Sequence, residues 1–317
     1  MPTPDFLVIG HALQDLIGEG DEPEWRLGGA VAYASALARR LGLRTAVLTS
    51  AGPDMDFERL LSGVDCRVIP GERTTQFRNI YPPQAEGQRR QVVPQSSDVT
   101  LAPEHVPDDC RDAGIVLLGP VVGEVTDDIA ACFPNALIGV GAQGFLREVD
   151  DAHHVRPVSP DRWDAEPLLR DASVLFVSDE DVSVDEAPAA IERWTRIVDI
   201  VVFTRGDRGA DVYYRGEERH INAFPCSTVD LTGAGDVFAA AFLIRLHETG
   251  RLPADRSDPW EATRFADCAA SFVVEADGLE GIPARDQIEA RLRENPEIIA
   301  TSTDPDGPRR VETNNQS

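Results

Sequence analysis

The chain has 317 residues, 42% of them hydrophobic, which suffices for one large α/β domain with a small accessory part. Its 30 basic and 55 acidic residues give a formal net charge of −25, which argues against nucleic acids and anionic membranes as partners. Every basic residue is arginine, so a Walker-A lysine, a Schiff-base lysine and a lysine general base are all excluded.

The first predicted element is a buried strand at residues 6–10 (FLVIG). No basic stretch precedes it, as a signal peptide would require, and no apolar run approaches the ~20 residues that span a bilayer. We therefore expect a cytoplasmic protein. Five cysteines stand far apart, which is typical of buried free thiols rather than of a disulfide framework or a zinc site: Cys66, Cys110, Cys132, Cys226 and Cys268.

Strand and helix alternate along most of the chain. An Ala-rich helix is predicted at residues 28–41, entered through a double glycine, and a strand at 44–49. This alternation is typical of a mostly parallel sheet with crossover helices. After residue 114 it returns, with strands predicted at 115–118, 137–140, 174–177 and 200–204, a hairpin at 212–214 and 220–223, a strand ending at Val229, and helices starting near Ala234 and Trp260.

Residues 71–100 break this rhythm. Side chains alternate from Thr75 to Tyr81, a turn is expected over Pro82, Pro83 and Gly87, and a return strand over 91–93, which together predict a hairpin. We expect a small β lid from segments near 11–27 and 71–95, through which a homodimer would form. The domain would span residues 1–300, and the composition of 301–317 predicts a disordered tail.

The segment from Asp230 to Asp236 (DLTGAGD) carries the clearest chemistry. Gly233 and Gly235 let the backbone bend and approach a ligand closely. The first N–H groups of the following helix have no partner within the helix and, with its dipole, form an anion site. Asp236 could there accept a hydroxyl proton while the N–H groups hold the charge of a transferring phosphoryl group. By spacing alone, an ordinary glycine-rich turn fits equally well.

The run VDLTGAGDVFAAAF is similar to the second signature of the ribokinase-like (PfkB) sugar kinases, D-T-x-G-A-G-D followed by an Ala- and Phe-rich helix. Gly28 and Gly29, about twenty residues after the first strand, resemble the first signature. The resemblance covers residues 5–295 and implies a three-layer α/β/α ribokinase-like fold. It also implies an enzyme that uses ATP and Mg²⁺ to phosphorylate a hydroxyl of a small sugar, polyol or inositol-like molecule.

The resemblance assigns roles within the catalytic turn. Asp236 would be the catalytic base, and the three residues before it would bind phosphates through their N–H groups: Gly233, Ala234 and Gly235. Asp230 would shape the loop and the nearby metal environment on the cofactor side. Thr232, assigned to the cofactor side as well, keeps a hydroxyl, whereas Leu231 departs from the usual Thr.

On the acceptor side, the resemblance implies that Asp15 and the double glycine hold the substrate. A carboxylate that accepts two hydroxyl donors suits a polyol. Arg147 would contact a phosphate, because in a chain without lysine the cation that binds a phosphate must be an arginine. Tyr33 stands near the position where ribokinases have an Asn, which counts against ribose.

On the donor side, the run FTRGDRG resembles the nucleotide loop V-T-x-G-x-x-G and assigns ATP contacts to Thr204, Gly206 and Gly209. The family motif N-x-x-E, which acts on Mg²⁺ and phosphate, is represented by Ser178-Asp179-Glu180-Asp181. Asp181 and Glu180 are therefore the expected metal residues, and Mg²⁺ needs few protein carboxylates when phosphate and water complete its shell.

The Ser at the N-x-x-E position, the run GGAVAYAS and the run QGFLR resemble the myo-inositol kinase-like branch more than ribokinases or fructokinases. Two alternatives stay open at this point. One is a nucleoside or ribose kinase. The other is a regulatory protein that binds a nucleotide or sugar without turnover, supported only by Leu231 and the altered SDED motif. The acceptor, the hydroxyl phosphorylated, the oligomeric state and any monovalent-cation dependence are left open.

Overall fold

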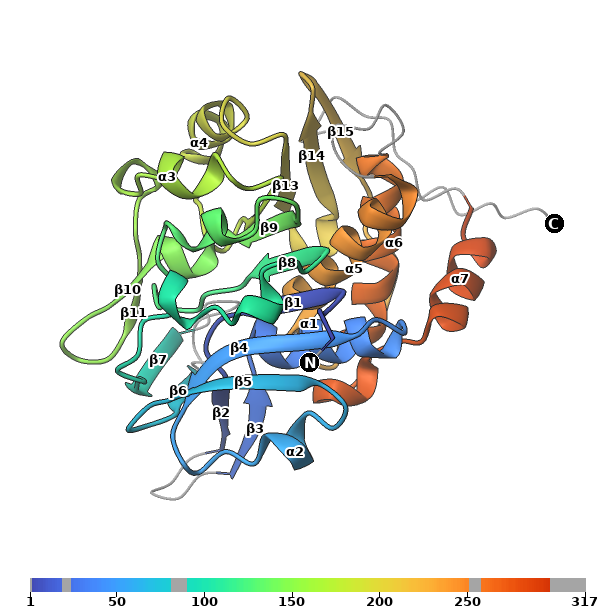
Figure 1. Ribbon diagram of the computed structural model, residues 1–317. Coiled ribbons are helices and arrows are strands. Elements are labelled where there is room, and N and C mark those ends of the chain that lie inside the picture. The colour runs from blue at the N-terminus through green and yellow to red at the C-terminus, as the bar shows by residue number, and fades with distance from the viewer. Residues whose placement is uncertain (1, 19–23, 81–89, 251–257, 297–317) are drawn as a thin grey trace.

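The computed structural model describes residues 2–18, 24–80, 90–250 and 258–296. Its main feature is a sheet of nine strands in the order β15-β14-β13-β12-β9-β8-β1-β4-β5 (Figure 1). Neighbouring strands run parallel from β13 to β5, while β13, β14 and β15 pair antiparallel. The strands are β1 (Phe6–Ile9), β4 (Thr45–Ala51), β5 (Asp65–Pro70), β8 (Ile115–Leu118), β9 (Leu137–Gly141), β12 (Val174–Ser178), β13 (Ile200–Thr204), β14 (Ala210–Tyr214) and β15 (Glu217–Ile221).

Helices cover both faces of this sheet, which makes three layers (Figure 1). Strand β1 shows why: Phe6 and Val8 pack into one core and Leu7 and Ile9 into the other, so the strand is apolar at every position. The first core holds α1 (Ala30–Arg40), α5 (Ala234–Thr249), α6 (Pro259–Val273) and α7 (Arg285–Glu294), and the second holds α3 (Glu166–Leu169) and α4 (Ala187–Trp194). The short helix α2 (Phe57–Leu60) packs at the rim of the first core.

A second sheet of four strands lies beside the carboxyl ends of the large sheet, in the order β3-β2-β6-β7. Its strands are β2 (Leu13–Ile17), β3 (Glu24–Gly28), β6 (Thr75–Ile80) and β7 (Arg90–Gln95). Next to β7 lies a two-stranded sheet of β10 (Arg147–Val149) and β11 (Val155–Pro157), linked to it by a bridge between Val92 and His154. The ribokinase-like three-layer fold and the additional small sheet were both expected from the sequence.

Two expectations need correction, and two others lie outside the described residues. No strand ends at Val229: the main sheet ends at β15, and Val229 is exposed in an irregular segment where its N–H donates to the carbonyl of Val274. The cysteines are free as predicted, but only Cys110 and Cys268 are buried; Cys66 and Cys132 are partly buried and Cys226 is exposed. The expected turn at Pro82, Pro83 and Gly87 and the expected tail at 301–317 lie outside the described residues.

None of the helices in the described parts of the chain combines the length and apolar character needed to cross a membrane.

Candidate active site

The glycine-rich turn leads into α5, as the sequence predicted. Gly233 is the residue before the helix, with φ 81° and ψ −4°, a left-handed conformation that favours glycine. A Cβ there would lie 2.2 Å from the Tyr33 ring, whereas Gly235 has no atom within 4 Å of where its Cβ would be. Among the described residues, the N–H groups of Gly235 and Asp236 have no acceptor, so this helix end is open to a ligand. The N–H of Ala234 instead bonds the Leu231 carbonyl at 3.4 Å.

Asp236, in the first turn of α5, has an unusual acidity. Burial raises its pKa from the ordinary value near 4 to about 7, although its side chain keeps some exposure. That value already includes a smaller rise from the negative charge of Asp15 and a fall from the Arg147 guanidinium. These electrostatic interactions show that Asp15, Arg147 and Asp236 come together, although 221 residues separate the two carboxylates in the sequence. A carboxylate with a pKa near neutrality is suited to taking a proton from a hydroxyl.

Asp15 is buried and lies on β2 of the four-stranded sheet. Its carboxylate rests against the backbone of Gly28, where a Cβ would lie 2.1 Å from Oδ2 of Asp15. Gly29 precedes α1 with φ 79°. The double glycine therefore makes room for the Asp15 carboxylate and for the start of a helix.

Asp230 and Thr232 hold the turn in shape. The N–H and hydroxyl of Thr232 donate to Oδ1 of Asp230 at 2.9 and 2.7 Å. The other oxygen of Asp230 accepts from Arg26 on β3, which also pairs with Asp277. Although burial raises the pKa of Asp230, the bonds from Thr232 and Arg26 outweigh it and lower the pKa overall. Asp230 and Thr232, two of the residues that the sequence assigned to the cofactor side, thus bond each other, and Asp230 also ties the loop to β3.

Arg147 begins β10, and its side chain is only 7% exposed. Its Nη2 lies 3.5 Å from Oδ1 of Asp181, whose other oxygen accepts from the N–H and hydroxyl of Ser178. Arg147 therefore lies between Asp181 and Asp236, the residues of two different motifs. A buried guanidinium in this position can compensate negative charge on either side.

The expected nucleotide loop lies beside the SDED motif. Ser178 and Thr204 are paired at the ends of β12 and β13, and Arg208 pairs with Asp179. Position 209 requires a glycine for structural reasons, because a Cβ there would lie 2.0 Å from the Ile221 carbonyl oxygen. Gly206 has open space around it. The structure therefore brings Thr204 and both glycines to the same edge of the sheet as the other site residues, where ligands bind in open α/β sheets.

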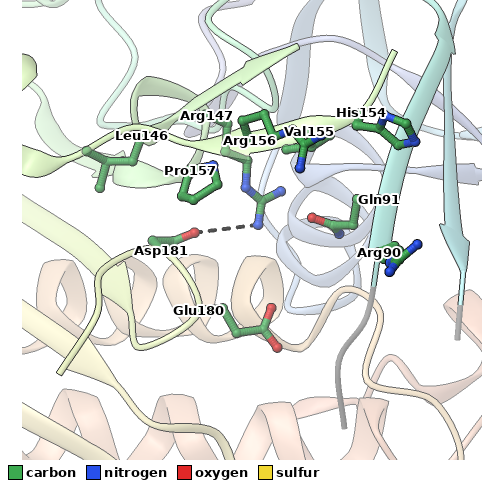
Figure 2. A pocket seen from close by; sticks show the side chains of 10 residues that line it. All are labelled: Arg90, Gln91, Leu146, Arg147, His154, Val155, Arg156, Pro157, Glu180 and Asp181. Atoms are coloured by element: carbon green, nitrogen blue, oxygen red, sulfur yellow. Dashed lines mark ion pairs between the residues drawn. The ribbon is translucent and has the colours of Figure 1, made fainter. Parts of the chain in front are cut away.

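A cavity of about 630 Å³ lies next to this constellation (Figure 2). It is bounded by β7, by the β10–β11 pair and by the loop after β12. Its lining residues are Arg90, Gln91, Leu146, Arg147, His154, Val155, Arg156, Pro157, Glu180 and Asp181. The size suits a sugar-sized molecule with part of a donor.

The carboxylates here fit a magnesium ion held mostly by phosphate and water. The described residues contain no group of three or more His, Cys, Asp or Glu able to hold a metal. Asp181 is already engaged with Ser178 and Arg147, while Glu180 lines the cavity. One or two carboxylates are what Mg²⁺ uses when it arrives with a nucleotide.

Sequence reasoning missed two contributors to the site. Arg26 joins a strand of the small sheet to the catalytic turn, but its partner Asp230 is 204 residues away and no local pattern marks it. Tyr33 was noted only as a departure from the ribokinases. It is fully buried against Gly233, and its hydroxyl has no hydrogen-bond partner among the described residues. Burial, followed by lesser effects of nearby charges, raises its pKa.

Comparison with known proteins agrees with this geometry. Residues 143–285 match the pfkB family carbohydrate kinases. The probable fructokinase-4 of Arabidopsis thaliana is 24% identical over 92% of this chain and 94% of its own length. The inositol 3-kinase of the same plant is 25% identical over 80% of this chain and 71% of its own.

Solved structures share the fold. A pyrophosphate-dependent kinase of the ribokinase family superposes with a TM-score of 0.71 at 21% identity, covering 90% of this chain and 99% of the other. The ribokinase of Arabidopsis thaliana, solved with ribose and ATP, gives a TM-score of 0.70 at 22% identity, covering 92% and 99%. Residues 143–285 of this chain therefore resemble the pfkB family carbohydrate kinases, the chain has a ribokinase-like fold, and it is a carbohydrate kinase, a phosphotransferase that acts on a hydroxyl group.

Proposed function

We propose that this protein transfers the γ-phosphoryl group of ATP to a hydroxyl of a small sugar, polyol or inositol-like molecule, with Asp236 as the base. The observation that carries the proposal is the position of Asp236. It is a carboxylate with a pKa of about 7, at an open helix N-terminus, beside Asp15 and Arg147 and next to a cavity. A purely structural turn has no need of such a carboxylate.

In the proposed reaction, Asp236 accepts the proton of the acceptor hydroxyl as that oxygen attacks the γ-phosphorus. The new O–P bond forms in line with the bond to the leaving phosphate oxygen, which departs with ADP. The N–H groups of Gly235 and Asp236 face the charge that develops on the transferring group. Mg²⁺, when bound with the donor, neutralises charge on the phosphates. Arg147 would add a second positive charge near the phosphates, in a chain that has no lysine to do so.

For the donor, we propose ATP along the loop from Thr204 to Gly209, supported by the contact between this loop and the SDED motif. Asp181 and Glu180 would act toward the metal, with Glu180 nearer the open cavity. Pyrophosphate is the second candidate donor, because one structural neighbour is a pyrophosphate-dependent kinase of the same fold.

For the acceptor, Asp15 and the backbone at Gly28 and Gly29 would bind hydroxyl groups. The four-stranded sheet carries Asp15 and would cover the acceptor, excluding water that would otherwise compete as the nucleophile. The same sheet stays our proposed surface for a homodimer. A nucleoside or ribose acceptor is the alternative within the same chemistry.

The test uses the purified full chain, a panel of sugars, polyols, inositols and nucleosides, and either ATP or pyrophosphate. Asp236→Asn should lower kcat about 10³-fold, because an amide cannot accept the proton. Asp286→Asn, the same change on the exposed surface of α7, should leave kcat unchanged.

A near wild-type kcat for Asp236→Asn would refute the base assignment. Retained ligand binding with no turnover by the wild type, across the whole panel and with both donors, would favour the non-catalytic regulatory protein.

A further inference from the structure

The cavity in Figure 2 has two walls of opposite charge. Glu180 and Asp181 lie on one side, on the loop after β12, where the donor and metal residues are proposed. Arg90, His154 and Arg156 lie on the other side, on β7 and around β11. The cationic wall is therefore separated from the proposed donor side by the cavity itself.

We propose that the acceptor carries an anionic group, a carboxylate or a phosphate, which this cationic wall binds away from the hydroxyl that reacts. The inference rests on the proposed kinase function and narrows its acceptor to acidic sugars or polyols. Guanidinium groups bind both anions through paired N–H donors, so carboxylate and phosphate share this chemistry.

The pairing of the strands supports the proposal. The bridge between Val92 and His154 is antiparallel, and the N–H of Val93 donates to the His153 carbonyl at 2.9 Å. Arg90 and Arg156 each lie two residues from this bridge, and both line the cavity. Two guanidinium groups on one cavity wall repel each other, and an anion bound between them would offset that repulsion.

The carboxylates near this wall are too few to neutralise its positive charge. Asp150 accepts from Nε of Arg156 at 2.8 Å and lies 3.5 Å from Nδ1 of His154. One carboxylate thus serves two basic side chains, and among the described residues no carboxylate is paired with Arg90. In a chain with a net charge of −25, acidic residues are abundant, so a cavity wall of two arginines and a histidine is a local exception.

The first arm of the experiment compares acceptors. Fructose, ribose and myo-inositol are assayed beside aldonic and uronic acids and beside sugar and inositol monophosphates. We expect kcat/KM for at least one acidic acceptor to exceed that of its neutral counterpart at least ~10-fold. Whether the acids or the monophosphates are preferred identifies the anion.

The second arm removes one charge at a time. Arg156→Gln and Arg90→Gln should each raise KM for the acidic acceptor about 10-fold, while KM for the donor and for neutral acceptors stays the same. Arg156 is 57% exposed, so its variant should fold. Arg170→Gln is the matched control, because Arg170 is 60% exposed at the end of α3 and outside the cavity.

Equal kcat/KM for neutral and acidic acceptors, with both variants like the wild type, would overturn the inference and leave the kinase function standing. A rise of the donor KM alone in the variants would also overturn it, by assigning the wall to donor phosphates. If no acceptor is phosphorylated with either donor, the proposed function itself fails.

Discussion

At the scale of single residues, the site depends on how charges around Asp236 are balanced. Burial is the largest cause of its raised pKa, and Asp15 adds to it while Arg147 opposes it. Two carboxylates held close together cannot both ionise easily, so Asp15, the proposed acceptor ligand, and Asp236, the proposed base, influence each other's ionisation. If the proposed roles of Asp15 and Asp236 hold, acceptor recognition and proton transfer are coupled through this electrostatic interaction.

This coupling predicts the pH dependence of the reaction. The base must be deprotonated, so kcat/KM should rise with pH and level off above about 7, the pKa of Asp236. Asp15→Asn removes a negative charge that raises this pKa, so the midpoint should move to lower pH, even as KM rises. Full pH profiles of both proteins check this, and an unchanged or higher midpoint in the variant would contradict the placement of the two groups.

At this scale, a contact could be predicted from the sequence when its residues lie close together along the chain, and not when they lie far apart. The DLTGAGD turn is local, so its glycines, its helix start and its carboxylate could be located from spacing and family resemblance. The bond from Arg26 to Asp230 and the buried position of Arg147 arise only when distant strands meet. Gly209 was assigned to nucleotide binding, yet the structure shows another reason for a glycine there: a side chain would collide with the Ile221 carbonyl.

At the scale of elements, the start of α5 depends on Gly233. Its left-handed backbone and the Tyr33 ring both exclude a side chain, while Gly235 two residues later has open space and lies within the helix. The two glycines look equivalent in the sequence and serve different purposes in the structure.

Gly233→Ala should therefore lower the free energy of unfolding by about 2–4 kcal/mol, from the cost of positive φ and from overpacking against Tyr33. Gly235→Ala should leave it unchanged or raise it by up to ~1 kcal/mol, because alanine is the better helix former. Chemical denaturation of both variants measures the difference. Equal effects at the two positions would show that the Tyr33 contact does not constrain the turn.

Elements were predictable where they were buried and regular. Runs such as IVLL and IVVFT gave strands with the bounds found, β8 and β13, because a central parallel strand is apolar on both faces. Strand β5 has intermediate burial at most positions and was not predicted. Val229 looked like a strand end because it is β-branched, but no strand lies beside it to pair with.

For the whole molecule, two partly buried carboxyl groups make the free energy of unfolding depend on pH. Burial raises the pKa of both Asp236 and Asp267 to about 7 from the ordinary value near 4. The folded protein then binds more protons than the unfolded chain between these values. Stability from these groups is present below about pH 4 and is lost as pH rises through about 7.

Thermal unfolding should therefore occur at a lower temperature at pH 8 than at pH 5. Asp267→Asn should reduce that difference by about 2 °C or more, since its amide can still accept from the N–H of Phe224 without carrying a charge. The surface variant Asp286→Asn is the control. A difference in Tm between pH 5 and pH 8 that persists fully in Asp267→Asn would refute the assignment.

The position of β1 in the middle of the large sheet also bears on how the protein is made. Residues 6–9 pair with 45–48 on one side and with 115–118 on the other. The second partner leaves the ribosome about 100 residues after β1, a delay of ~5–20 s at typical rates of synthesis. During that time the nascent chain presents an unpaired, wholly apolar strand edge, so its yield should depend on chaperones that bind early in translation.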